Sequence, residues 1–380
     1  MHDVCNQDVL IYRFIPHGSR KVDDCKPLFD YSKDFCNIKM ICHDQETLNF
    51  KDYYFLKTVY LDVKTDFYPV FNVILDRYSK RKFGIPEHYS RSLLLHSEMQ
   101  SNDVAWFEQD GSVGVYWWSH AVIARDWFRY AEIDPFLTRP SSPQKDFLIY
   151  NRAWCGLREY RLKFVELVLD YNLQDHCQLT FNPTDDGKHW REHKFLNNAF
   201  EPTRTDLDQH FQPSTVDATA SADYNSQDYA QTAFEVVLET VFDNTKWHLT
   251  EKSLRPIACG QPFILAGTPG ILQYLKRYGF QTFGEYINES YDSIQDPVQR
   301  LEAIVKLMQS ISSLSDQEKQ QLYSDLAPIC EYNKSRFFSA EFFDQVIGEF
   351  QTNFAQGFAF IQQSRSDRDL EIYMKNFGEQ

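Results

Sequence analysis

The sequence of 380 residues contains no uninterrupted apolar run of about 18 residues, the length that a membrane-spanning helix needs. Its first residues, MHDVCNQDVLIYRF, also lack the basic segment and the apolar segment of a secretory signal peptide. Both absences predict a soluble, cytoplasmic protein. Material for packed cores is ample, because 43% of the residues are hydrophobic and 16% aromatic. The length favours two domains over one.

Paired cysteine motifs are absent as well. The eight cysteines are scattered without a CxxC pair, which is typical of reduced, buried thiols rather than of a disulfide framework or a zinc site. Cys36, Cys42 and His43 are the metal-ligating residue types that lie nearest together, and their spacing is a poor match to known zinc sites. We therefore expect no bound metal.

The chain lacks the net positive charge that is typical of proteins that bind nucleic acid strongly, since its net charge is −15. The acidity is uneven. Residues 1–140 hold 17 basic and 20 acidic residues, a balance of −3, and the remainder has a balance of −12. The dense basic run at residues 77–82, RYSKRK, lies in the nearly neutral part. It is either a solvated loop or a contact for an anionic partner.

The segment RPSSPQK, residues 139–145, predicts a boundary between two domains, because its prolines disfavour both helix and strand. Apolar runs on both sides of it predict strands at residues 9–14, 38–42, 71–75, 93–95, 113–118, 146–151, 232–240 and 263–266. Apolar periodicity and capping residues predict helices at residues 157–171, 251–259, 271–278, 298–312, 316–327 and from 343 through 361.

The window HLTEKSLRPIACGQPFILAG, which begins at His248, places charged residues at a helix start beside a core strand. Thr250 is the expected N-cap, and Gly260 the expected stop. Lys252 and Arg255 near free backbone amides predict a phosphate site, and Glu251 could accept hydrogen bonds from a ribose. This combination fits a nucleotide diphosphate. The alternative is a surface ion pair between Glu251 and Arg255, with Lys252 in solvent.

The stretch LTEKSLRPIACGQPFIL resembles the Thr-Glu-Lys motif of GT-B glycosyltransferases, in particular the fucosyltransferase type. DFLIYNRAWCGLREYRL resembles the start of their second Rossmann-like domain, whose basic residues face the donor phosphates; Arg152, Arg158 and Arg161 occupy comparable places. More broadly, ICHDQE, YWWSHAVIARDWFRYA and YNRAW resemble uncharacterised glycosyltransferase-like proteins of tailed bacteriophages. The resemblance implies an α/β protein of GT-B type, with two Rossmann-like domains facing a cleft and a helical C-terminal region.

Two departures bear on this resemblance. The GxGxxG dinucleotide fingerprint is absent, and Asp206 and Asp208 form the only DxD near the polar middle segment. A metal-dependent GT-A enzyme would use that triplet to hold a divalent ion. The two-lobed layout favours GT-B, in which basic residues and helix dipoles usually replace the metal, so we expect no cofactor beyond the nucleotide sugar.

The expected organisation follows from the resemblance. Residues 1–139 would form the acceptor domain, 140–145 the linker, 146–330 the donor domain, and 331–380 helices that pack back on the two lobes. A second Gly-rich turn after residues 263–266, and polar residues around the strand at residues 232–240, extend the donor site. The expected donor-binding residues are Arg152, Arg158, Ser221, Tyr224, Glu239, Thr250, Glu251, Lys252, Arg255, Gly267, Thr268 and Gly270.

Catalysis with inversion would need a base at a strand end of the first domain, where ligands of open parallel sheets bind. Glu98 is the favoured base; the alternative is that each such residue is a loop cap or a satisfied hydrogen-bond partner. The full set of catalytic candidates is Glu98, Asp44, Glu46 and His120. The expected acceptor-binding residues are His17, Arg20, Arg77, Arg81 and Lys82.

The predicted function is transfer of a sugar from a nucleotide sugar to an acceptor hydroxyl. One candidate acceptor is a hydroxymethylated base in phage DNA. The alternative acceptor is a polysaccharide or a small molecule. A non-catalytic nucleotide-binding interaction protein is the alternative from another class. A phage-encoded protein would act in the host cytoplasm, with no membrane span.

Overall fold

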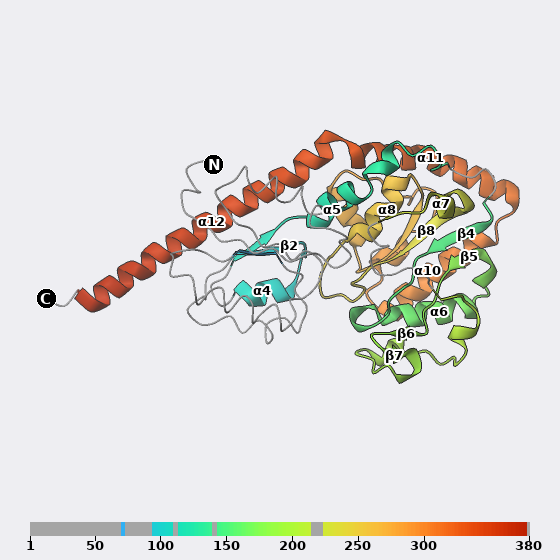
Figure 1. Cartoon of the computed structure of the whole chain (residues 1–380), viewed down its shortest axis with the longest axis horizontal. Helices are drawn as coiled ribbons and strands as arrows, with labels where there is room; N and C mark the ends of the chain where they lie inside the picture. The colour runs from blue at the N-terminus through green and yellow to red at the C-terminus, as the bar shows by residue number, and fades with distance from the viewer. Residues whose placement is uncertain (1–69, 73–92, 109–112, 139–142, 214–222, 378–380) are drawn as a thin grey trace. The chain divides into compact units, whose positions relative to one another are not determined.

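The computed structural model describes residues 70–72, 93–108, 113–138, 143–213 and 223–377 (Figure 1). It shows a mixed α/β protein with parallel sheets. The chain divides into two compact units: unit 1 comprises Met1–Ile123 and Asp344–Gln380, and unit 2 comprises Ala124–Phe343. This division lies earlier in the chain than the linker expected at residues 140–145, of which 140–142 fall outside the described residues.

Unit 1 contains a parallel sheet in the order β1 (Val70–Asn72), β2 (Leu93–His96) and β3 (Val113–Tyr116). Helix α4 (Asn102–Glu108) connects β2 to β3, as a parallel crossover requires. The long helix α12 (Ala340–Phe377) returns to this unit from the far end of the sequence. Its Phe350 ring lies 4.8 Å from that of Trp117, and Asn353 donates a hydrogen bond to the carbonyl of Tyr116.

Unit 2 is built on four parallel strands in the order β5 (Cys177–Leu179), β4 (Lys145–Ile149), β8 (Thr232–Leu238) and β9 (Phe263–Ala266). Every residue of β8 and β9 is buried. Continuous apolar runs of this kind are typical of parallel strands that are covered on both faces. The predicted strands at 146–151, 232–240 and 263–266 are thereby confirmed.

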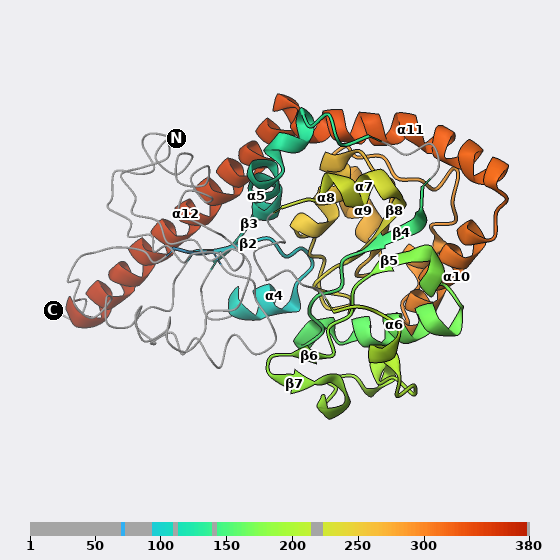
Figure 2. The same ribbon diagram turned by 45° about the vertical axis from the view of Figure 1, so that its right-hand side comes forward.

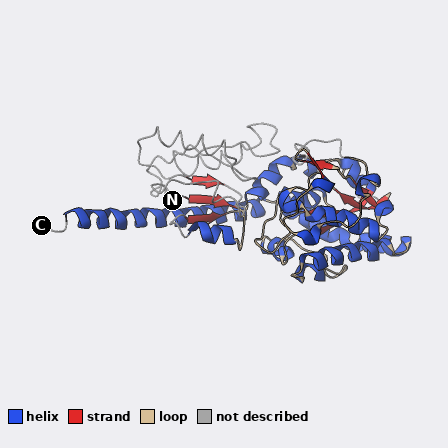
Figure 3. Cartoon of the chain, turned by 90° about the horizontal axis from the view of Figure 1, so that it is seen from below, coloured by secondary structure: helices blue, strands red, loops and turns tan. Residues whose placement is uncertain are grey.

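Helices cover both faces of the unit 2 sheet. Helices α6 (Tyr160–Asp170) and α10 (Pro297–Ser312) pack against each other, and α8 (Glu251–Cys259) packs against β8 and against α11 (Asp316–Phe338) (Figure 2). Figure 3 shows helices, in blue, around the red strands of this unit. The chain runs from β4 to β5 on one side and later adds β8 and β9 on the other. Right-handed crossovers in opposite directions place α6 and α8 on opposite faces. The connection after β4 leads to one edge of the sheet, and the connection after β8 leads to the other edge. The position between these two strands is therefore the topological switch point of the sheet.

The remaining elements are short, except for the helices at the end of the chain. Both α10 and α12 fall where sequence periodicity predicts helix, whereas α11 continues past the predicted end at residue 327 to Phe338. The predicted strands at 9–14 and 38–42 lie outside the described residues. The other elements are α5 (Ser119–Trp127), η4 (Arg129–Glu132), η5 (Gly156–Arg158), η6 (Gln174–His176), β6 (Thr184–Asp185), β7 (Lys188–His189), η7 (Trp190–Glu192), η8 (Asn198–Phe200), η9 (Leu207–Gln209), α7 (Ser226–Gln231), α9 (Ile271–Arg277) and η11 (Ser290–Ser293).

Candidate functional site

The carboxyl edge of the unit 2 sheet brings together the loops that follow β4, β8 and β9. Arg161, in the first turn of α6, ties the first two loops to each other. Its Nη1 donates to the carbonyl of Ala153 at 2.7 Å, and its Nη2 donates to that of Leu238 at 2.6 Å. Burial lowers the pKa of this guanidinium. The switch point of the sheet is thus bridged by a buried cation.

The start of α8 is built as the sequence predicts. Thr250 is the N-cap, and its side chain accepts a hydrogen bond from the backbone nitrogen of Lys252. Gly260 ends the helix with φ of 72°, a left-handed conformation that favours glycine. The predicted helix 251–259 and both of its caps are therefore confirmed.

Glu239, directly after β8, faces the start of this helix and is fully buried. Its Oε1 accepts from Thr250 N at 3.0 Å and from Ser253 Oγ at 2.5 Å. Its Oε2 accepts from Thr250 Oγ1 at 2.8 Å and from Thr240 N at 3.2 Å. Four bonds use the roughly four lone-pair positions of a carboxylate. Glu239 therefore anchors α8, and the expected ribose contact is not among its bonds.

Lys252 lies at the same helix start, with 24% of its side chain exposed. Its Nζ is 2.7 Å from Glu251 Oε1 and 3.3 Å from Thr250 Oγ1. Glu251 is buried and pairs with its neighbour Lys252, so the alternative of a surface pair between Glu251 and Arg255 is wrong. Lys252 remains the partly exposed cation of the Thr-Glu-Lys motif.

Arg255 points into the protein, contrary to its expected role as a phosphate ligand. Its Nη2 lies 2.6 Å from Glu235 Oε1, and its Nε donates to the hydroxyl of Tyr229 at 3.2 Å. The guanidinium also lies 4.2 Å from the centre of the Tyr150 ring. Glu235 is on β8, so this ion pair joins α8 to the sheet it covers. A guanidinium held in this way has a structural role.

The Gly-rich turn after β9 is also used within the protein. Gly267 O accepts from Arg300 Nε at 3.1 Å, and Thr268 Oγ1 donates to the carbonyl of Lys246 at 2.8 Å. Gly270 N donates to the carbonyl of Asp292 at 2.7 Å, and the Asp292 carboxylate accepts from Leu272 N at the start of α9. Burial raises the pKa of Asp292 to about 6. The structure thus places a carboxylate of the chain at both helix starts where the sequence suggested phosphates.

Tyr224 is not part of the carboxyl edge. It precedes α7, which leads directly into the first residue of β8, so Tyr224 belongs near the opposite edge of the sheet. Its hydroxyl donates to Asp134 Oδ2 at 3.1 Å, and burial, followed by Asp134, raises its pKa. The Tyr224 hydroxyl is bonded within the protein, and the expected contribution of Tyr224 to the nucleotide pocket stays a prediction. Ser221, expected beside it, lies outside the described residues.

The loop after β4 contains Arg152 and Arg158, which were predicted from the sequence to contact the donor phosphates. It also contains Asn151, which was not predicted. Arg152 and Arg158 are half-buried there, and Arg152 forms no ion pair with any carboxylate of the described residues. Asn151 is 1% exposed, and neither its Nδ2 nor its Oδ1 has a hydrogen-bond partner within the described part of the chain. Its place at the end of the strand predicted at 146–151 was the signal available in the sequence.

In unit 1, the described candidates for the base follow β2 and β3. Glu98 is 1% exposed, and its Oε2 accepts from Ser101 Oγ at 2.9 Å. His120 lies in the first turn of α5 and is equally buried. Because Trp117 N donates to the carbonyl of His96, the two strand ends are joined at one edge of the sheet. The other candidates lie outside the described residues: Asp44, Glu46, His17, Arg20, Arg77, Arg81 and Lys82.

The DxD triplet is engaged by basic residues. Arg204 lies 2.8 Å from Asp206, and Arg191 lies 2.8 Å from Asp208. Hydrogen bonds from Arg204, followed by one from His210, lower the pKa of Asp206. Within the part of the chain that the structure describes, no cluster of three His, Cys, Asp or Glu side chains suits a metal ion.

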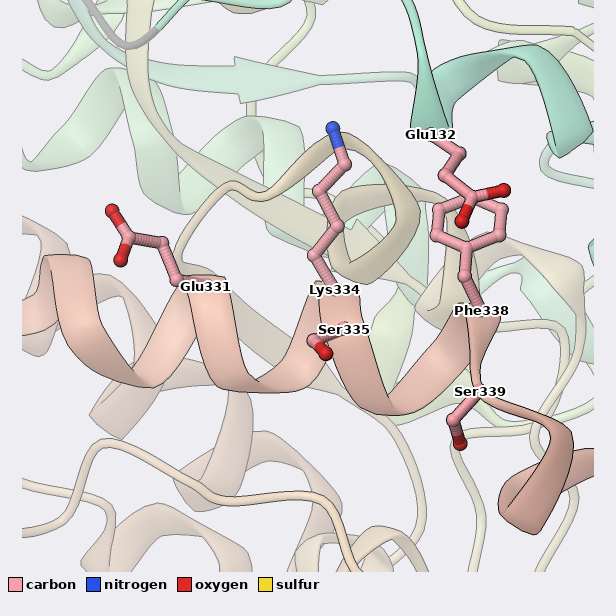
Figure 4. A pocket seen from close by; sticks show the side chains of 6 residues that line it. All are labelled: Glu132, Glu331, Lys334, Ser335, Phe338 and Ser339. Atoms are coloured by element: carbon pink, nitrogen blue, oxygen red, sulfur yellow. The ribbon is translucent and has the colours of Figure 1, made fainter.

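A hollow at the far end of α8 is separate from the carboxyl edge. Figure 4 shows its lining side chains, with the amine of Lys334 between the carboxylates of Glu331 and Glu132. The Lys334 side chain lies beside Gly260, the C-terminal stop of α8, whereas Lys252 lies at the other end of that helix. The hollow is therefore not part of the candidate donor site.

No protein-family model matches the sequence, and neither a curated protein nor a solved structure is significantly similar to the chain. Among the helices of the described residues, none is both long enough and apolar enough to cross a membrane. The function must therefore be argued from the site itself.

Proposed function

We propose that this protein is a nucleotide-sugar-dependent glycosyltransferase of GT-B type, and that unit 2 binds the donor at the carboxyl edge of its sheet. The observation that carries the proposal is the switch point between β4 and β8, with Arg152 and Arg158 on one loop and Lys252 beside the other. Ligands of open parallel sheets bind at such points. Several cations there would balance the charge of a diphosphate without a metal.

Within this proposal, Lys252 is the donor contact of the Thr-Glu-Lys motif. Its amine needs only to exchange its bond to Glu251 for one to a phosphate oxygen. Arg152 and Arg158 would contact the diphosphate from the opposite loop. The carboxylates of Glu239 and Asp292 already accept hydrogen bonds at the starts of α8 and α9. The phosphates would therefore be bound by these three cations. The resemblance to fucosyltransferase-type enzymes supports the same assignment.

Glu98 is the proposed base for the acceptor hydroxyl, and His120 is the second choice. Both lie at the carboxyl edge of the unit 1 sheet, where a ligand of that sheet would bind. A hydroxymethylated base in DNA and a glycan are the proposed acceptors. The basic run at residues 77–82 favours DNA, whereas the net charge of −15 favours the glycan.

A panel of nucleotides tests the donor assignment. Calorimetry of the purified protein with UDP, GDP, ADP, CMP and their sugar conjugates should identify one that binds at micromolar concentration. Replacing Lys252 with alanine should weaken that binding by about 1.5 to 3 kcal/mol, the cost of a charge-assisted hydrogen bond. Lys276, an exposed lysine in the last turn of α9, provides a matched control. Equal effects of the two substitutions would contradict the assignment.

Release of nucleoside diphosphate from the donor then separates an enzyme from a binding protein. The burial of both Glu98 and His120 is the observation that favours a non-catalytic nucleotide-binding protein. Tight binding without release of product in the presence of candidate acceptors would support that second function.

A further inference from the structure

Asn151 and Arg161 are two buried polar groups whose bonding capacity is not used up within the described part of the chain. Asn151 has a donor and an acceptor without a partner. Arg161 Nε likewise has none, and no carboxylate of the described residues lies within ion-pair distance of its guanidinium. A buried polar group without a partner costs free energy, so native proteins rarely keep one without a reason.

Asn151 lies on the loop after β4, and Arg161, in the first turn of α6, is bonded to that loop. Arg161 donates to the carbonyl of Ala153, and Ala153 is two residues from Asn151, a separation of at most about 7 Å along the chain. The loop is also held firmly. Asp185 Oδ2 accepts from the backbone nitrogens of Trp154 and Cys155, both at 2.7 Å. Asn151 thus lies on a loop that is fixed at the switch point, and Arg161 is bonded to the same loop.

The start of α6, which follows this loop, differs from the starts of α8 and α9. Its N-cap residue, Glu159, makes no capping bond. The Glu159 carboxylate instead accepts from Leu196 N at 2.7 Å and from Asn197 N at 2.6 Å. By contrast, Glu239 and Asp292 place carboxylates at the starts of α8 and α9. The positive end of α6 therefore reinforces the positive charge of Arg161.

We propose that Asn151 and Arg161 Nε bind the diphosphate ester of a nucleoside at the switch point. Phosphate oxygens accept from Asn151 Nδ2 and from Arg161 Nε, and a hydroxyl of the ligand donates to Asn151 Oδ1. The inference deepens the proposed function and rests on it. It adds Asn151, which the sequence did not identify, and it names Nε as the atom through which Arg161 binds the ligand. Asn151 is the better of the two to test, because Arg161 also holds the loops together.

The test relies on the free energy that the buried, unbonded side-chain amide of Asn151 costs the folded protein. Leucine has nearly the shape of asparagine but no polar atoms, so Asn151→Leu should leave Tm unchanged or raise it by about 2 to 4 °C. The same variant should weaken binding of UDP, GDP, ADP or inorganic pyrophosphate, whichever binds the wild type, at least about tenfold. Asn151→Ala, which cannot overpack the site, should weaken binding to the same extent.

Asn333 is the matched control. It is equally buried in the same unit, but both of its side-chain atoms are bonded to Gln281, at 2.8 and 2.9 Å. Asn333→Leu should therefore lower Tm. A similar fall in Tm for both Asn151 variants would show that the Asn151 amide is bonded within the protein, and it would overturn the proposal.

The binding results also separate this proposal from the proposed function. Unchanged affinity in the Asn151 variants, or no binding of any probe to the wild type, would overturn the role of Asn151. Binding that depends on Asn151 without sugar transfer would keep that role and reject the glycosyltransferase. Transfer with an unchanged KM in Asn151→Leu would reject the role of Asn151 and keep the enzyme.

Discussion

The carboxylate of Glu239 lies 3.0 Å from the backbone nitrogen of Thr250, the residue that caps α8. Glu239 directly follows β8, so this hydrogen bond fixes the start of the helix relative to the carboxyl edge of the sheet. The negative charge also complements the positive end of the helix. It occupies a position at which the sequence suggested a phosphate. Under the proposed function, the phosphates of the donor would therefore bind at the neighbouring cations.

Replacing Glu239 with glutamine should destabilise the protein by about 2 to 3 kcal/mol, because a buried, charge-assisted network loses its acceptor. Urea denaturation would measure this change. Glu302 provides the control, because it forms an exposed ion pair with Lys306 on α10. Replacing Glu302 with glutamine should change the unfolding free energy very little. A variant of Glu239 that is fully stable but no longer binds nucleotide would instead support the ribose contact.

Replacing Arg255 with methionine should cost about 3 to 5 kcal/mol of stability, because Glu235 would be left as a buried, unpaired charge. A second replacement, Glu235→Gln, should restore part of that loss. Denaturation of the single and double variants would give the coupling between them. A stable Arg255→Met variant with impaired nucleotide binding would show that Arg255 contacts the ligand after all.

Asp292 should make stability depend on pH. Its pKa is about 6 in the folded protein, above the ordinary value of 3.8, so the folded state binds the proton more tightly than the unfolded state. Its contribution is fully present below pH 3.8 and is lost as the pH rises through 6. The loss amounts to about 3 kcal/mol for a shift of two pKa units.

Asp292→Asn keeps an oxygen for Leu272 N but does not titrate. The difference in unfolding free energy between the wild type and this variant should therefore change between pH 4 and pH 6 and be constant above. Taking the difference removes the contributions of other carboxylates, such as Glu166, whose pKa is lowered. Parallel curves for the two proteins would show that Asp292 titrates normally.

If Glu98 is the base, Glu98→Gln should lower kcat at least about a hundredfold, the usual contribution of general base catalysis, with little change in donor affinity. Steady-state kinetics with the identified donor would measure both. Ser101→Ala removes the one hydrogen bond from Ser101 to this carboxylate and serves as a milder comparison. Equal and small effects of the two substitutions would leave Glu98 with a structural role.

Local structure could be predicted because its causes are local. Thr250 and Gly260 cap α8 through bonds and backbone angles within a few residues, and the apolar run in β9 reports its burial directly. The charged side chains were predicted less well. Arg255 was expected to face a phosphate, but its partner is Glu235, twenty residues earlier on the adjacent strand. Helical spacing cannot reveal a partner on another element.

The sequence by itself determined the α/β class, three of the four strands of the main unit 2 sheet, most of its longer helices, and the presence of cations near one helix start. Only the tertiary structure decided which of those cations remain partly exposed. It placed Glu239 and Asp292 at two helix starts and left Asn151, in the loop after β4, without a partner among the described residues. The physical reason is that capping and apolar periodicity act over a few residues, whereas a buried charge takes its partner from whichever element the fold brings beside it.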